Sequence, residues 1–189
     1  MKTDSYLKAL TRIVWAYIFL FLDVSLYSGP TNIGLLPNWA GWLLILTVLP
    51  EMEKKECSAV LLRPVVMLLG IWEAVCWIAV LFTGNSISLS FPLVQLICSV
   101  LTLYFHFQFF TNLASIAAAH DLPEYSRQML YVRTVSTIYS AVIDVFFWFY
   151  PLDSVSGTIQ IFLVITALCI ILWMALTLFQ FRKAEKRQF

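Results

Sequence analysis

Apolar residues fill long stretches of this chain, and polar residues collect in the short segments between them. A helix that crosses a bilayer needs roughly 20 mainly apolar residues. The predicted spans are residues 8–27, 37–50, 62–82, 91–115, 130–150 and 158–181. The second span is short, because charge returns at Glu51. The pattern predicts an all-α polytopic membrane protein, a bundle of six transmembrane helices forming a single domain over residues 1–189.

Composition agrees with this pattern. Hydrophobic residues make up 61% of the chain and charged residues 12%, whereas an ordinary soluble domain has about 25% charged residues. The net charge of +1 gives no reason to expect a nucleic-acid partner. The four cysteines contain no CxxC pair, so neither a disulfide framework nor a metal site is expected. The N-terminal segment resembles a secretory signal but lacks a small-residue cleavage site, which predicts an uncleaved first span.

The basic residues predict the orientation of the spans. Lys and Arg are retained on the cytoplasmic side during insertion, and with six spans every basic residue falls on one side. They precede the first span, lie between the second and third, lie near the fourth connection, or form the tail: Lys2, Lys8, Arg12, Lys54, Lys55, Arg63, Arg127, Arg133, Arg182, Lys183, Lys186 and Arg187. Both termini are therefore expected in the cytoplasm.

The segment between the first two spans, SGPTNIGLLPNWAGW from residue 28, carries no charge. Since the second span is too short to cross alone, we expect Gly34 to Pro37 to enter the bilayer as a re-entrant loop and Asn38 to cap the following helix. An ordinary interfacial turn is the alternative, with Trp39 and Trp42 in the aromatic belt.

The motif formed by Asn32-Ile33-Gly34, Leu36-Pro37-Asn38-Trp39 and Gly41-Trp42-Leu43-Leu44-Ile45 resembles a segment of uncharacterised small multi-pass membrane proteins of Firmicutes. In that group Asp is usual where this chain has Asn38. The resemblance covers residues 32–45 within the first third of the chain. It implies a loop followed by a span, and it implies no activity. The expected location is the bacterial cytoplasmic membrane.

Three acidic residues fall inside the predicted spans: Asp23, Glu73 and Asp144. An ionised side chain at the bilayer centre costs about 2.5–3.5 kcal/mol on insertion scales, so such residues are functional candidates. Asp23 lies near the outer surface, where water reduces this cost. Glu73 lies near the middle of its span and is the strongest candidate.

Two polar stripes accompany these acids. Residues 95, 99, 102 and 106 share one helical face of the fourth predicted span, and residues 133, 137, 140 and 144 share one face of the fifth. Stripes of this kind commonly hold helices together through hydrogen bonds. If they face each other beside Glu73, then His106, Glu73 and Asp144 form a polar centre able to hold a proton or cation. Asp23 is the outermost candidate of this centre.

Other patterns carry less weight. Arg12, Arg63 and Arg133 each precede one of the acids by ten or eleven residues, which could mark a threefold repeat or simple flanking charges. A bis-histidine haem site needs its two ligands on separate helices, and His106 and His120 are the only histidines. His120 is expected in the cytoplasmic connection, so only a second copy of the chain could complete such a site. No catalytic motif is present. We expect no cofactor and no metal. An intramembrane enzyme built on Glu73 and Asp144 stays open.

Two function classes follow. The protein is either a small proton- or cation-coupled carrier or channel component, or a non-catalytic membrane interaction or assembly protein. In the second class the intramembrane polar residues lock helices together or dock a partner. The expected partners are the lipid bilayer, a small cation or proton, and a second copy or another membrane protein.

Overall fold

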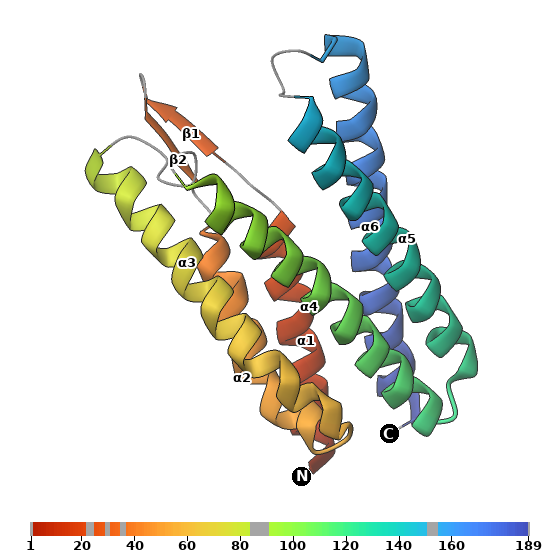
Figure 1. Ribbon diagram of the computed structural model, residues 1–189. Coiled ribbons are helices and arrows are strands. Elements are labelled where there is room, and N and C mark those ends of the chain that lie inside the picture. The colour runs from red at the N-terminus through yellow and green to blue at the C-terminus, as the bar shows by residue number, and fades with distance from the viewer. Residues whose placement is uncertain are drawn as a thin grey trace.

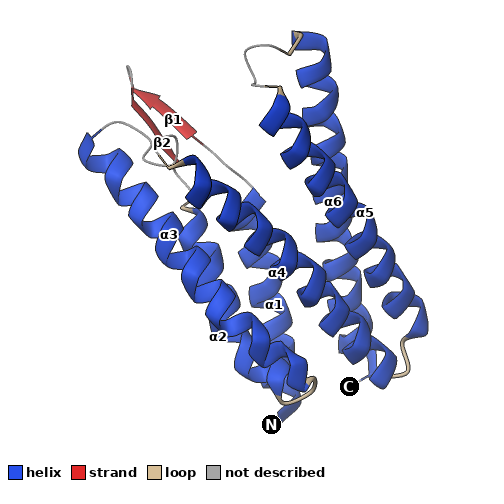
Figure 2. Cartoon of the chain, viewed as in Figure 1, coloured by secondary structure: helices blue, strands red, loops and turns tan. Residues whose placement is uncertain are grey.

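The computed structural model describes residues 2–21, 25–28, 31–34, 37–83, 91–150 and 155–188. Helices dominate this part of the chain (Figure 2). In order they are α1 (Lys2–Phe21), α2 (Asn38–Glu53), the 3-10 helix η1 (Cys57–Leu61), α3 (Leu62–Thr83), α4 (Pro92–Ala119), α5 (Pro123–Phe149) and α6 (Gly157–Gln188). Strands β1 (Ser25–Ser28) and β2 (Thr31–Gly34) pair antiparallel between α1 and α2.

The long helices run alternately up and down, and the two termini lie at the same end of the bundle (Figure 1). We call this the terminal end. The β hairpin lies at the opposite end, beside the ends of α1 and α3. There, α5 and α6 diverge from α3 and α4 (Figure 1).

Four helices of the described chain are long and apolar enough to cross a membrane: Cys57–Thr83, Pro92–Ala119, Pro123–Phe149 and Gly157–Arg187. The predicted polytopic all-α fold is thereby confirmed. Helix α2 has only 16 residues, and every 18-residue window of α1 contains Asp4, Lys8 and Arg12. The six-span count and the cytoplasmic side of the termini therefore stay predictions.

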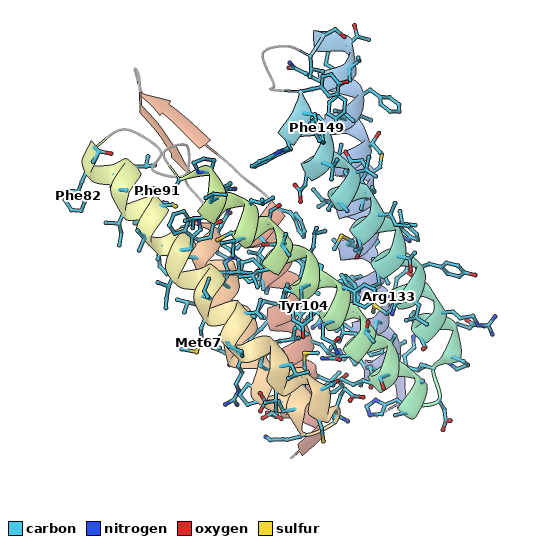
Figure 3. All side chains as sticks on the ribbon, in the orientation of Figure 1. Met67, Phe82, Phe91, Tyr104, Arg133 and Phe149 are labelled. Carbon is cyan, nitrogen blue, oxygen red and sulfur yellow. The ribbon has the colours of Figure 1, made fainter. Side chains whose placement is uncertain are left out.

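The outer surface of the bundle is apolar, as expected for helices that face lipid. Figure 3 shows Met67 and Phe82 pointing away from α3, and Phe149 lies at the far end of α5. Phe82 is 86% exposed and Phe149 is 71% exposed. Exposed aromatic residues at helix ends fit the headgroup level of a bilayer, where Trp and Tyr also gather.

Several helix ends differ from the predicted span boundaries. The first span was expected to reach Tyr27, but α1 ends at Phe21 and Tyr27 belongs to β1. Helices α4, α5 and α6 extend past their apolar stretches at the terminal end, to Ala119, from Pro123 and to Gln188. For α5 and α6, apolarity alone did not indicate these ends, because they consist mainly of polar residues that continue each helix beyond its apolar stretch.

The segment before α2 also differs from the expectation. In place of an irregular loop, residues 31–34 form β2, where Gly34 is the register partner of Ser25. Asn38 does not cap α2: Pro37 occupies the N-cap position with extended backbone, and no side chain accepts a cap bond there. Proline suits a helix start because its missing N–H would have no intrahelical partner. The depth of Gly34 and Pro37 in the bilayer stays a prediction.

Helices α1, α2 and α3 pack closely through small residues. A Cβ added at Gly41 of α2 would lie 2.7 Å from Leu20 Cγ and 2.9 Å from the backbone oxygen of Ala16, both in α1. On the other side of α2, Trp42 lies against Gly70 of α3, where an added Cβ would be 3.2 Å from Trp42 Cβ. Small residues allow such backbone approach between membrane helices.

A tight turn joins α4 to α5 at the terminal end. Asp121 adopts a left-handed conformation with φ of 54°. The Leu122 N–H donates to the Ala117 carbonyl at 2.9 Å, and the Asp121 N–H donates to the Ala118 carbonyl at 3.2 Å. These two bonds form a Schellman motif, which satisfies carbonyls at the end of α4. The turn fixes His120 at the C-cap of α4.

Candidate functional site

A cavity of about 350 Å³ lies between α3, α4, α5 and α6, with Phe21 of α1 at its edge. It extends from Gln95 in the first turn of α4 to His106 near the middle of that helix. Its polar lining residues are Glu73, Gln95, Ser99, Thr102, His106, Ser136, Thr137, Tyr139, Ser140 and Asp144. Leu69, Leu103, Ile170, Ile171 and Met174 supply most of its apolar wall.

This cavity brings together the residues of the expected polar centre. Glu73 comes from α3, His106 from α4 and Asp144 from α5, and all three are partly buried. The stripe on α4 lines the cavity completely, and three of the four stripe positions on α5 line it from the opposite side. The helical spacing thus places these side chains around one common space.

Asp144 is held in position by α4. The Ser99 hydroxyl donates to Asp144 Oδ2 at 2.5 Å. The bond fixes one carboxylate oxygen at the cavity wall and joins α4 to α5 at the same point. Tyr139, which also lines the cavity, joins α5 to α6: its hydroxyl donates to the Leu163 carbonyl at 2.7 Å.

Aromatic rings surround His106. The Tyr17 hydroxyl and His106 Nδ1 share a hydrogen bond of 3.1 Å. The ring of Phe21 stacks on the imidazole with centroids 5.7 Å apart, and Phe105 meets it edge-on at 5.2 Å. Two helices therefore fix the orientation of this ring, since Tyr17 and Phe21 belong to α1 and Phe105 to α4.

Two candidates of the sequence analysis are not in the cavity. Arg133, the first residue of the α5 stripe, donates to the Thr111 hydroxyl at 3.1 Å and lies over the Phe107 ring at 4.5 Å. Arg63 pairs with Glu53 instead of an acid on its own helix. These partners favour the interpretation of both arginines as flanking charges. Asp23 lies outside the described residues.

Sequence reasoning missed several wall residues. Ser136 and Tyr139 lie one position away from the α5 stripe, so a wider helical face would have included them. Thr137 between them did belong to the predicted stripe. Its hydroxyl oxygen is buried and has no hydrogen-bond partner in the part of the chain that the structure describes. Tyr17 gave no signal, because an aromatic residue in a membrane span is ordinary until its partner across the bundle is known.

The lining is acidic. It holds two carboxyl groups and an imidazole, and no Lys or Arg side chain among the described residues lines it. No three His, Cys, Asp or Glu residues in the described ranges converge closely enough to hold a metal ion. Hydroxyl, amide and carboxylate oxygens instead offer a partly wet wall for a proton or a weakly coordinated cation.

Comparison of the chain with protein-family models, with curated proteins and with solved structures gave no match. The interpretation of the site therefore rests on its own residues and geometry.

Proposed function

We propose that this integral membrane protein is a small carrier that binds a proton or a small cation at Glu73 and Asp144 and couples its release to movement across the bilayer. The observation that supports this proposal is the acidic cavity between α3 and α6, which opens two membrane-embedded carboxyl groups to one shared space. Carboxyl groups kept at membrane depth commonly mark ion or proton pathways.

The residues have distinct roles in this proposal. Glu73 binds and releases the cation from the middle of α3. Asp144, fixed by Ser99, completes the site from α5. His106 provides a nitrogen close to the same space, with its orientation set by Tyr17. The apolar residues of α6 form the opposite wall, so movement of α6 changes access to the site without breaking the carboxylate contacts.

A second function has its own supporting observation. Hydrogen bonds join α1 to α4, α4 to α5 and α5 to α6, through Tyr17, Ser99 and Tyr139. Such bonds between membrane helices stabilise assembly, as expected of a non-catalytic interaction protein. In that alternative the cavity is a by-product of helix packing and takes no ion.

Flux through reconstituted protein tests the proposal. Purified protein in liposomes is exposed to imposed proton, sodium or potassium gradients, and internal pH and membrane potential are recorded. The parent protein should carry at least one of these ions. Glu73→Gln and Asp144→Asn should abolish the flux while keeping a near-parental melting temperature, because the amides keep size and hydrogen bonding but cannot ionise.

Controls separate the two functions. Glu51→Gln removes the exposed ion pair with Lys54 at the terminal end and should leave flux unchanged. An assembly role predicts the opposite pattern: no flux in any protein, full tolerance of Glu73→Gln, and loss of folded protein in Glu73→Leu. Parental flux in Glu73→Gln would contradict the carrier proposal.

A further inference from the structure

A chain of hydrogen bonds through Lys55, His120 and Glu185 lies at the terminal end of the bundle. Lys55 Nζ lies 2.8 Å from His120 Nε2, and His120 Nδ1 lies 2.6 Å from Glu185 Oε1. An imidazole that donates from Nδ1 to Glu185 and accepts at Nε2 from Lys55 satisfies both contacts. These three residues come from the α2–η1 connection, the end of α4 and the end of α6. We call this set the terminal chain.

Helix α1 joins the terminal chain through Tyr6. The Tyr6 ring meets His120 edge-on with centroids 5.9 Å apart, and Lys55 lies 4.5 Å above the same ring. Burial, and to a smaller extent the charge of Glu185, raise the pKa of Tyr6 well above its ordinary value of 10.0. Elements from both ends of the sequence therefore meet at one point.

The carboxyl group of Glu185, at one end of the terminal chain, is fully buried. Glu185 is 0% exposed, which is unusual for a residue in a charged C-terminal tail. Its Oε2 and the Tyr6 hydroxyl are buried with no hydrogen-bond partner among the described residues. Burying unpaired polar atoms is unfavourable. If the terminal chain opened, water could bond to both atoms. The free-energy difference between the closed and the open arrangement is therefore smaller than it would be if every polar atom were paired.

An apolar layer separates the terminal chain from the cavity. Phe109, Phe110 and Leu113 follow His106 along α4, and Met129 of α5 and Phe181 of α6 belong to the same buried apolar cluster. All five are fully buried or nearly so. Along α4 this layer lies between His106, which lines the cavity, and His120, which belongs to the terminal chain.

We propose that the Lys55–His120–Glu185 chain and the apolar layer beneath it form the gate at the terminal end: the chain holds the α2–η1 connection and the ends of α4 and α6 together, and it must break before the layer can open and a bound cation can leave by that side. The proposal rests on the carrier function. A carrier alternates between two access states that differ by only a few kilocalories per mole. A small set of charged hydrogen bonds, which water can replace when the helix ends separate, suits the control of such an equilibrium.

Reactivity of a native cavity cysteine tests the gate. Cys98 lines the cavity and is 7% exposed. Cys57, Cys76 and Cys169 are replaced by Ser, and an impermeant charged thiosulfonate reagent is added to either face of sealed vesicles of known orientation. In the parent, Cys98 should react from the face opposite the termini. Glu185→Gln, His120→Gln and Lys55→Met should raise the rate from the terminal face by about tenfold or more, a shift of about 1.4 kcal/mol in the gate equilibrium.

A matched control lies at the same end of the bundle. Glu53→Gln breaks the Arg63–Glu53 ion pair, which is outside the terminal chain, and should leave the labelling rate at the parental value. A general loss of stability would raise labelling from both faces equally and would overturn the gate. Unchanged labelling in all three variants would also overturn it, as would loss of folded protein in all three.

The outcome is separable from that of the proposed function. Increased labelling from the terminal face without any ion flux in the parent would contradict the carrier and support the closure of this end by the terminal chain. Ion flux with unchanged labelling would support the carrier and contradict the gate.

Discussion

Replacing Gly41 with alanine should loosen the contact between α1 and α2. The new Cβ would lie 2.7 Å from Leu20 Cγ and 2.9 Å from the Ala16 backbone oxygen. The Leu20 side chain can rotate away, but the Ala16 oxygen can move only with α1 itself. Overpacking of this kind typically costs about 1–3 kcal/mol. Because the Ala16 oxygen belongs to the backbone, we expect a cost in the upper part of that range, about 2–3 kcal/mol. Alanine returns about 1 kcal/mol through its higher helix propensity, which leaves a net loss of about 1–2 kcal/mol.

Thermal unfolding in detergent checks this value. For a chain of this length, a loss of that size lowers Tm by about 2–8 °C. Gly157→Ala is the matched control, because no atom lies within 4 Å of a Cβ added there, and its Tm should stay at or slightly above the parental value. A Gly41→Ala protein that melts at or above the parental temperature would refute the close approach of α1 and α2.

Three further predictions concern the turn at Asp121, the carboxylate of Glu56 at the start of η1, and the orientation of the protein in the membrane. Asp121→Gly should keep or raise Tm, whereas Asp121→Val should lower stability by about 1–2 kcal/mol, because a branched residue resists positive φ; equal Tm values would contradict the turn. Hydrogen bonds from Ser115 and Ser58 lower the pKa of Glu56, so its stabilisation is complete above its ordinary pKa of 4.5 and is lost as pH falls below it. Glu56→Gln should therefore lose less stability than the parent on acidification, and equal losses would argue against these bonds. In a cysteine-free background on intact cells, Ser86→Cys should react with an impermeant thiol reagent and Ser126→Cys should not; labelling at both would contradict cytoplasmic termini.

Helical periodicity made the cavity wall predictable. Residues four, seven and eleven positions apart share a helix face, so the stripes on α4 and α5 could be read without knowing how the helices pack. The sequence also indicated Glu73, because an acid in an apolar stretch stands out. It could not indicate that Tyr17 would meet His106, since that contact depends on the packing of α1 against α4.

The terminal chain was not predictable for a different reason. Glu185 lies in the tail sequence RKAEKR, where a single acid among basic residues is typical of a solvated helix. Only the packing of α6 against α1 and α4 buries it. His120 was expected in a cytoplasmic connection, and it does lie at the terminal end, but its bonds to Lys55 and Glu185 join residues 65 positions apart on either side.

The β hairpin was missed because its residues were assigned to a span and a loop by apolarity alone. Tyr27 and Ile33 are common in strands as well as in membrane helices. Each strand has only four residues, and an alternating pattern of that length is too short to distinguish a strand from a membrane helix. Pro92 and Pro123 each begin a helix, since the ring fixes φ near the helical value. The start of α5 at Pro123 was not predicted, because the fifth span was expected from residue 130 on apolarity alone.

Water access to Asp144 is the most direct test of the account, because a cation site must be wet whereas a packing contact is sealed. In a cysteine-free background, Asp144→Cys should react with a small water-soluble thiol reagent in membranes. Val142→Cys on the same helix is the control, since Val142 is 59% exposed on the bundle surface and lipid should cover it. Reaction at position 144 together with protection at position 142 is the predicted result. Protection at both positions, or equal reaction at both, would contradict a water-filled acidic cavity.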